Sequence, residues 1–343
     1  MHAFAHPDQS RHQPQFFLQR GQVRLNFEVA ARAEALLDAL KQMGAEIATP
    51  ALVAPEALLA VHATDYVAFL QEAAAEWAAM PDSGPEVVAN MHPSPEMLAQ
   101  GATLSGPIIG RTGWFTADTA CPIGPGTWES VLAAASCALA AAGVAAQGGS
   151  AYALARPPGH HAYAARAGGH CYVNNSALAA EALRRAGAAR VAVIDIDAHH
   201  GNGTQGIFWD RPDVLTLSVH GDPASYYPWY VGHASETGGG AGQGFNRNFP
   251  LPRGTGDSPW LEAVDAAAAA ARSFGAEALV VPLGFDASEH EPLSFLRVTA
   301  DGFAGAAQRL SGLGLPTVMV QEGGYNTAVI GGLLRRFLTG WHG

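Results

Sequence analysis

The stretch Asp195-Ile-Asp-Ala-His-His-Gly201 directly follows the apolar run Arg190-Val-Ala-Val-Ile194 and decides how the chain is interpreted. The apolar run is typical of a strand buried on both faces, so the polar stretch falls where a parallel strand would end. Buried carboxylates and imidazoles are costly at such a place unless a cation compensates them. Alternation along the strand predicts that Asp195, Asp197 and His199 face one side, and such ligands suit zinc or a similar divalent ion. The stretch is therefore predicted to be half of a hydrolytic metal site.

Short apolar runs alternate along the chain with alanine- and leucine-rich stretches that have helical periodicity. Helices are predicted at about 28–43, 128–147, 176–187, 259–274, 300–313 and 326–339, and strands at 151–154, 190–195, 214–219, 278–283 and 316–321. This alternation predicts an α/β protein with a doubly wound, mainly parallel sheet in a three-layer α/β/α sandwich. In such sheets ligands bind outside the carboxyl ends of the strands. Because polar clusters follow the predicted strands, we expect one site in a single domain that spans residues 1–343.

The composition suits a large buried core and an acidic surface, with 48% hydrophobic residues, 14% charged residues and a net charge of −11. The negative charge disfavours nucleic acid as a partner and is compatible with a cationic substrate. Three cysteines without CxxC spacing (Cys121, Cys137 and Cys171) predict neither a disulfide framework nor a structural zinc cluster, and favour a reducing cytoplasm. No leader-like N-terminus and no uninterrupted apolar stretch of about 18 residues is found, so we expect a soluble cytoplasmic protein without a membrane partner.

The segment at about 80–127 is rich in proline and glycine and has no long periodic run. A structureless stretch of this length is uncommon inside a compact domain and is usually functional. Its Trp114 and Phe115 are expected to pack against a neighbouring subunit or to fold over the mouth of the active site. A surface excursion without function is the alternative.

Asp286 is the third predicted metal ligand beside Asp197 and His199, because Gly284-Phe-Asp286 follows a strong strand and would face the same mouth. Two carboxylates and one imidazole leave coordination positions open, as a catalytic metal requires. Fe²⁺ or Co²⁺ could occupy the same ligands as Zn²⁺. For any one of these residues taken alone, a capping or turn role is the alternative.

Two further places carry side chains suited to proton transfer and oxyanion binding. His160 and His161 follow the rigid turn Pro157-Pro-Gly159, so that one imidazole can accept a proton from water while one protonates a leaving amine. Tyr325 follows two glycines after the last strand, and its hydroxyl can donate a hydrogen bond to a tetrahedral oxyanion. A structural histidine pair and a locally packed tyrosine are the alternatives.

Several longer motifs stand around these residues. They are RPPGHHA at 156–162, GGHCYVNN at 168–175, DIDAHHGNGTQ at 195–205, SVHGDP at 218–223 and LGFD at 283–286. With these motifs the chain resembles the histone deacetylase superfamily, and within it the bacterial acetylpolyamine amidohydrolases, from about residue 27 to the C-terminal Glu322-Gly-Gly-Tyr325. The resemblance implies an arginase–deacetylase fold and hydrolysis of linear amides, with His160 and His161 as the acid/base pair.

The resemblance also implies two bound cations and the roles of the residues around them. One zinc ion would be held by Asp197, His199 and Asp286, and a structural K⁺ would lie beneath it, bound through Asp195, Asp197, His199, Ser218 and Val219. Asp195 would orient His160, and Asn202 would orient His161. Tyr325 would help to polarise the amide carbonyl.

A substrate tunnel is implied in the same way, with walls formed by Gly169, His170, Tyr227 and Leu293. His170 stands opposite Tyr227 where relatives usually have Phe or Tyr, so this wall is more polar and is expected to carry charge at low pH. The acidic residue that grips a distal ammonium in relatives has no clear counterpart near Ala120, and Asp118 is the candidate substitute. The 80–127 segment would build a homodimer and narrow the mouth.

The sequence therefore predicts a zinc-dependent amidohydrolase that removes acetyl or another short acyl group from small amines such as acetylpolyamines. An acetyl-lysine protein deacetylase and a hydrolase of another small amide are the alternatives. A two-metal ureohydrolase is disfavoured, because Ser288 stands two residues after Asp286 where that class needs another Asp. A non-enzymatic binding protein is disfavoured because no predicted ligand is lost.

Overall fold

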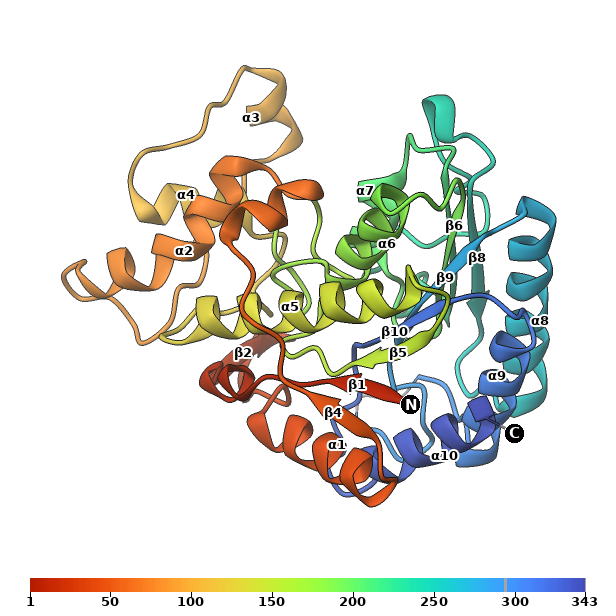
Figure 1. The fold of residues 1–343 in the computed structure, drawn as a ribbon. Helices are drawn as coiled ribbons and strands as arrows, with labels where there is room; N and C mark the ends of the chain where they lie inside the picture. The colour runs from red at the N-terminus through yellow and green to blue at the C-terminus, as the bar shows by residue number, and fades with distance from the viewer. Residues whose placement is uncertain (293–294, 343) are drawn as a thin grey trace.

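The computed structural model describes residues 1–292 and 295–342, and in these residues an eight-stranded sheet crosses the molecule (Figure 1). The strand order is β4-β1-β5-β10-β9-β6-β7-β8, and all neighbouring strands pair in parallel. The strands are β1 (His2–Phe4), β4 (Glu46–Ala48), β5 (Ser150–Ala153), β6 (Val191–Asp195), β7 (Val214–Gly221), β8 (Asn246–Leu251), β9 (Ala278–Leu283) and β10 (Thr317–Gln321). A separate antiparallel hairpin consists of β2 (Phe16–Gln19) and β3 (Gln22–Leu25). The predicted mainly parallel sheet is confirmed.

Helices cover both faces of the sheet and complete the predicted three layers (Figure 1). One face carries α1 (Ala30–Gln42), α8 (Asp257–Phe274), α9 (Ala300–Ser311) and α10 (Ile330–His342). The other carries α5 (Thr127–Ala145), α6 (Asn175–Arg185) and the short α7 (Asn202–Phe208). Short 3₁₀ turns lie at Pro7–Arg11, Pro55–Ala60 and Gly240–Gly242.

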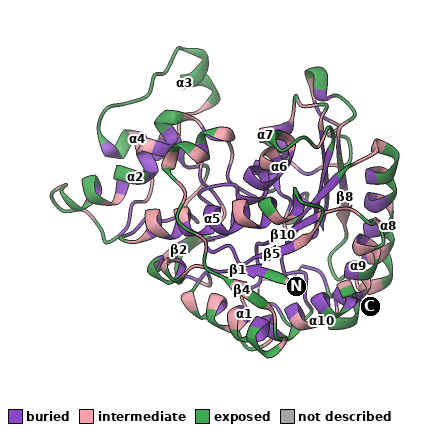
Figure 2. Ribbon diagram, viewed as in Figure 1, coloured by how far each residue is buried: buried purple, intermediate pink, exposed green. Residues whose placement is uncertain are grey.

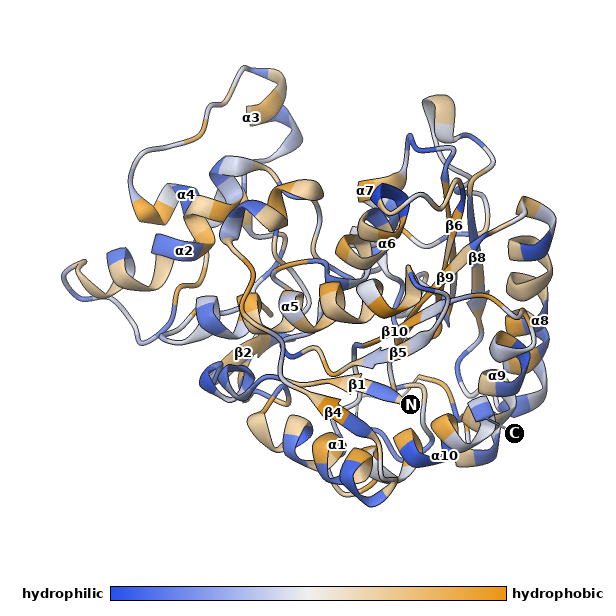
Figure 3. Cartoon of the chain, viewed as in Figure 1, coloured by the Kyte–Doolittle hydropathy of each residue, from blue (hydrophilic) through white to orange (hydrophobic). Residues whose placement is uncertain are grey.

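Strand alternation divides the core between these two layers. In β6, Val191 and Val193 belong to the core cluster on the side of α6, whereas Ala192 and Ile194 belong to the one on the side of α8. Because both faces are covered, the central strands β6, β7, β9 and β10 are buried throughout, whereas β4 at the edge is exposed in Figure 2 and partly hydrophilic in Figure 3. This double burial places the polar groups of the sheet at the strand ends.

The predicted helices and strands are all present, but the prediction was incomplete. It missed β1, β4 and β8, which are short or partly exposed and therefore lack a continuous apolar run. It also missed α2 (Thr64–Ala78). The last helix begins at Ile330 and not at residue 326.

The 80–127 segment contains α3 (Pro95–Ala99) and α4 (Ile108–Phe115), so the expectation of a structureless stretch was wrong. Ser94 caps α3 and Pro95 occupies its first turn, where proline starts a helix without losing a hydrogen bond. Phe115 is 1% exposed and its ring lies 5.1 Å from that of Phe69 in α2, while Trp114 packs on the same cluster. Phe115 therefore anchors the segment to its own chain and does not reach a neighbouring subunit.

Helix α5 is long and apolar enough to cross a membrane by length and composition alone. In the structure, 61% of its apolar window is buried inside the molecule. Ala134, Cys137, Ala138, Ala141, Ala142 and Ala145 belong to the cluster that covers β5 and β10, and core helices of this kind pass the same test. The helix is thus accounted for by internal packing.

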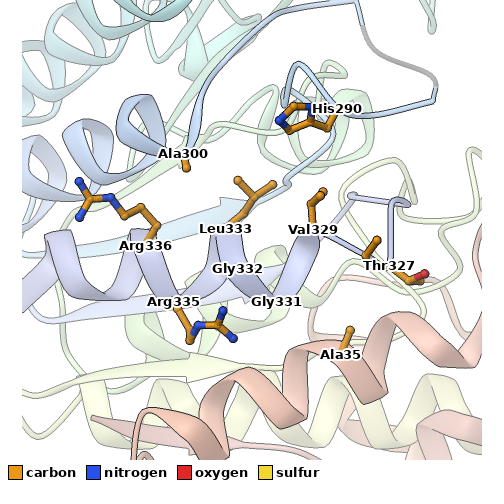
Figure 4. Close-up of a pocket in the computed structure, with 11 residues that line it drawn as sticks. Ala35, His290, Ala300, Thr327, Val329, Gly331, Gly332, Leu333, Arg335 and Arg336 are labelled. Atoms are coloured by element: carbon orange, nitrogen blue, oxygen red, sulfur yellow. The ribbon is translucent and has the colours of Figure 1, made fainter.

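Two adjacent glycines in α10 allow the contact between α1 and α10 to be tested (Figure 4). A Cβ atom on Gly331 would lie 2.7 Å from the carbonyl oxygen of Ala35 in α1, whereas one on Gly332 would meet only Arg335, at 3.9 Å. Gly331→Ala should lower the free energy of unfolding by about 1–3 kcal/mol through overpacking. Gly332→Ala should raise it by about 0.5–1 kcal/mol through helix propensity. Urea denaturation measures both, and equal effects would show that the two helices do not pack this closely.

Candidate active site

The three predicted metal ligands converge at the ends of two adjacent strands. Asp197 and His199 lie in the turn after β6, and Asp286 follows β9. One ligand atom from each lies within 4.8 Å of the others, with His199 Nδ1 at 3.0 Å from Asp286 Oδ2 and 3.3 Å from Asp197 Oδ1. Because β6 ends at Asp195, a tight turn and not strand alternation brings Asp197 and His199 together.

Backbone amides fix the two carboxylates in place. Asp197 accepts hydrogen bonds from the amides of His199 and Gly323, both at 2.8 Å, and Asp286 accepts one from Ala198 at 2.9 Å. A Cβ atom on Gly284 would lie 1.8 Å from Asp197 Oδ2, so only glycine permits this approach of β9. The carboxylates are thus oriented by the protein backbone itself.

The electrostatics of this cluster fit a bound cation. Burial raises the pKa of Asp286, and Asp197 raises it further. Burial opposes ionisation of Asp197 as well, but His160 and His199 outweigh burial and hold its pKa below the usual range. His199 has a pKa raised to about 9, because the two carboxylates outweigh its own burial. Two carboxylates and one imidazole that converge in this way form the donor set of a zinc-type site.

The tandem histidines lie beside the metal cluster with their ring centroids 4.0 Å apart. His160 Nδ1 is 2.9 Å from Asp195 Oδ2, and His161 Nδ1 is 2.6 Å from the side-chain oxygen of Asn202. Burial lowers the pKa of His160, but Asp195 and Asp197 outweigh it and raise the pKa to about 10. Burial and the neighbouring His160 hold the pKa of His161 well below its ordinary value. Adjacent cationic and neutral imidazoles can divide acid and base work.

Glu322 connects the end of β10 to the histidine turn, a role that the sequence did not reveal. Its Oε2 accepts hydrogen bonds from the amides of Gly159 and His160 at 2.6 and 3.0 Å, and its Oε1 accepts one from Ser176 Oγ at 2.9 Å. The side chain is 0% exposed, and burial raises its pKa to about 7. In the sequence, the role of Glu322 is indicated by its position directly after a strand that is predicted to be buried.

Tyr325 is held through its backbone and its ring. Its amide donates to Glu291 Oε1 at 2.6 Å, and the Arg32 guanidinium lies 4.7 Å from its ring centroid. Arg32 also donates to the carbonyl oxygens of Glu322 and Gly324 and pairs with buried Glu28. Burial raises the pKa of Tyr325 well above 10, so its hydroxyl remains a donor. Sequence reasoning missed Glu291 and Arg32, although Glu28 and Arg32 have the i, i+4 spacing of a helical ion pair.

The residues predicted to bind a monovalent cation include Asp197 and His199 of the metal cluster, and the others lie in β6 and β7. Ser218 pairs in register with Asp195 across β6 and β7, and its Oγ lies 2.8 Å from His220 Nδ1. A small cavity of about 10 Å³ has Asp195 and Ser218 in its lining, but its lining does not include Asp197, His199 or Val219. The side chain of Val219 packs in the core, so only its backbone could serve as a ligand.

Three of the predicted tunnel residues surround the histidines and Tyr325. The Tyr227 ring centroid lies 4.9 Å from that of His161, and that of His170 lies 5.8 Å from that of Tyr325. Gly169 contacts both His161 and Tyr227. Burial lowers the pKa of His170 to about 4, so the expected charge on this wall would appear only near that pH. Leu293 lies outside the described residues.

A larger cavity of about 550 Å³ lies between α1 and α10 (Figure 4). Its lining includes Ala35, His290, Arg335 and Arg336. Among the residues that the structure describes, those lining this cavity include no predicted catalytic or metal-binding side chain. The candidate active site is therefore identified by its converging side chains and not by this cavity.

A comparison with protein families shows that residues 26–340 match the histone deacetylase domain. The chain belongs to the histone deacetylase family. It is 43% identical over 343 residues to a Burkholderia pseudomallei protein named acetylpolyamine amidohydrolase, covering 99% of this chain and 98% of that protein. It is 40% identical over 307 residues to a Mycoplana ramosa protein of the same name, covering 89% of each. The predicted resemblance is confirmed.

Solved structures agree with this family assignment. The crystal structure of acetylpolyamine aminohydrolase from Burkholderia pseudomallei superposes with a TM-score of 0.94 at 42% identity, covering 99% of this chain and 98% of that one. The HDA15 HD domain superposes with a TM-score of 0.77 at 24% identity, covering 99% and 88%, and supports the fold alone. The predicted arginase–deacetylase fold is confirmed.

Glu322 should matter for turnover more than for substrate binding. Glu322→Ala removes the acceptor that holds the histidine turn, and a displacement of about 1 Å costs on the order of 100-fold in kcat. Glu322→Gln retains an oxygen for the two amides and should restore most of this loss. Ser176→Ala, which removes only the hydroxyl donor, is the matched control. Steady-state kinetics beside thermal unfolding would refute the role if kcat of a folded Glu322→Ala variant stayed at the wild-type value.

Replacing Asn202 by Asp should move the pH profile of amide hydrolysis. A carboxylate beside His161 Nδ1 raises the pKa of His161, typically by about 1–3 units. A base with a higher pKa is protonated up to a higher pH. The fall of kcat/KM on the acid side of the profile should therefore occur at a higher pH. A pH–rate profile of Asn202→Asp that overlays the wild-type profile would contradict this coupling.

Proposed function

We propose that the chain is a divalent-metal-dependent amidohydrolase that removes acetyl or other short acyl groups from small amines such as acetylpolyamines. The observation that carries the proposal is the convergence of Asp197, His199 and Asp286 beside two histidines with opposite pKa shifts. The relatives named acetylpolyamine amidohydrolase, similar over nearly their full length, support the substrate class. An acetyl-lysine protein deacetylase and a hydrolase of another small amide are the competing assignments.

Zinc is the proposed metal, and Fe²⁺ or Co²⁺ would fit the same side chains. Asp197, His199 and Asp286 would hold it, and K⁺ would lie below, bound through Asp195, Asp197, His199, Ser218 and Val219. When bound at such a site, a divalent ion polarises the amide carbonyl and lowers the pKa of water. The register pairing of Asp195 with Ser218 supports the position of the lower cation.

The remaining steps follow from the side chains of the chain itself. His161, neutral at pH 7, accepts the proton that water releases as it attacks the acyl carbon. Tyr325, protonated far above neutral pH, donates a hydrogen bond to the oxygen that becomes negative. The C–N bond then breaks as the histidine pair returns a proton to the leaving amine. Asp195 and Asn202 keep the two rings oriented throughout.

The surroundings of the site favour a small, cationic substrate. The chain carries a net charge of −11, which attracts cations at long range. The 80–127 segment exposes apolar side chains that suit a contact with a second copy of the chain, and we propose that it forms a homodimer and narrows the mouth. These exposed side chains are Met91, Met97, Leu98, Leu104 and Ile109. The three cysteines are free and buried, which supports a reducing cytoplasm.

A substrate panel tests the proposal directly. Zinc-reconstituted protein should hydrolyse acetylputrescine, acetylcadaverine and acetylspermidine with higher kcat/KM than an acetyl-lysine peptide. A chelator should abolish activity and added Zn²⁺ should restore it. Tyr325→Phe, which lacks the oxyanion donor, should lower kcat by about 100- to 1,000-fold. Preference for the peptide would favour the protein deacetylase, and failure on every substrate with zinc bound would overturn the acyl-amine assignment.

A further inference from the structure

Asp118, just after α4 in the 80–127 segment, joins three parts of the chain through one carboxylate. Its Oδ2 accepts a hydrogen bond of 2.6 Å from the hydroxyl of Tyr227 and one of 3.1 Å from the amide of Gly169. Its Oδ1 accepts a hydrogen bond of 2.8 Å from the amide of Ala120. A carboxylate has about four acceptor positions, so these donors occupy most of its capacity.

Two of these partners, Gly169 and Tyr227, both adjoin His161. A Cβ atom on Gly169 would lie 2.5 Å from Cδ2 of His161 and 2.8 Å from the hydroxyl of Tyr227. The Tyr227 ring meets the His161 ring edge to face at 4.9 Å. Asp118 therefore spans the two segments that flank His161.

The two segments are attached to the 80–127 segment in different ways. The Gly169 side is joined by backbone hydrogen bonds, from Ala117 N to the carbonyl oxygen of Ala167 at 2.7 Å and from His170 N to that of Ala120 at 3.1 Å. The Tyr227 side follows β7 in a turn whose Trp229 is 54% exposed. The Tyr227 hydroxyl crosses to Asp118, and a hydrogen bond between a hydroxyl and a carboxylate is of the strong, charge-assisted kind.

We propose that Asp118 is a positioning residue that fixes the distance between the Gly169 and Tyr227 segments, so that the site admits a slender acylated amine and rejects a bulky one. The proposal rests on the proposed function and names a determinant of its substrate range. It also makes the 80–127 segment part of the active-site wall. The occupied acceptor positions favour this role over that of a free anion awaiting a distal ammonium.

Two variants and two amides of equal length separate these roles. The variants are Asp118→Asn and Tyr227→Phe, alone and combined, and the amides are cationic acetylputrescine and neutral N-pentylacetamide. If Asp118 holds the Gly169 and Tyr227 segments together, each single variant should raise KM for both amides by about tenfold and change kcat little. The loss of a charge-assisted hydrogen bond readily produces a factor of this size. The double variant should be no worse than the more damaged single variant, because both weaken the same bond: Tyr227→Phe removes its donor, and Asp118→Asn replaces its charged acceptor by a neutral amide oxygen. The bulky acetyl-lysine peptide should lose less, which narrows the selectivity.

Asp82→Asn is the matched control, since exposed Asp82 lies in the same segment and its replacement removes the same charge. It should leave both KM values unchanged. The positioning role would be overturned if Asp118→Asn raised KM for acetylputrescine alone while Tyr227→Phe kept the wild-type KM values. That result would identify Asp118 as a partner of the ammonium. Additive losses in the double variant would overturn the positioning role as well.

Hydrogen–deuterium exchange gives a measurement that does not depend on the reaction. Asp118→Asn and Tyr227→Phe should each accelerate amide exchange at residues 168–171 and 222–231 by about tenfold, whereas Asp82→Asn should not. Unchanged exchange in both variants would overturn the proposal. If the wild-type protein hydrolyses none of the amides, the proposed function fails, while exchange still decides whether Asp118 holds the two segments.

Discussion

Buried negative charge at the ends of neighbouring parallel strands is the constraint on which the rest of the structure depends. Asp195, Asp197, Asp286 and Glu322 are all nearly inaccessible to solvent and follow or end β6, β9 and β10. Each has a compensating group, because an unpaired buried carboxylate would cost several kcal/mol or would bind a proton. Asp195 faces His160, the other two aspartates share His199, and Glu322 receives backbone amides. The proposed cation in the metal cluster would complete this balance.

The order of the sheet makes such a concentration of charge achievable. β5, β10, β9, β6 and β7 are consecutive neighbours, and all run in the same direction, so their carboxyl ends deliver polar turns to one edge. Layers of helices exclude water from the faces of the sheet, which strengthens the electrostatic interactions at that edge. The same arrangement separates the pKa values of His160 and His161, since burial and the neighbouring His160 lower that of His161, whereas Asp195 and Asp197 outweigh burial at His160.

The sequence predicted what depends on local pattern and on strand ends. Runs of apolar residues located the five central strands, and the polar residues after them identified the candidate metal ligands and both histidines, which the structure brings together. Pattern could not locate β1 or β4, which pair at the edge with only three residues each. It could not assign Glu322 or Arg32, because their partners are backbone groups about 160 and 290 positions away in the chain. Phe115 was misread because composition does not reveal that α2 lies beneath it.

The site is supported in two ways. One holds the candidate catalytic residues, and the other holds the outer segments that are proposed to limit the size of the substrate. The histidine turn and Tyr325 are held from within by buried Glu322 and Arg32, whose hydrogen bonds to backbone atoms leave little freedom. The outer segments at Gly169 and Tyr227 are joined by half-buried Asp118, which binds the backbone amide of Gly169 and the side-chain hydroxyl of Tyr227. Opening the outer segments would cost a hydrogen bond near solvent, whereas displacing the histidines would strand a buried carboxylate. Substrate range can therefore change through the 80–127 segment while the catalytic geometry stays fixed.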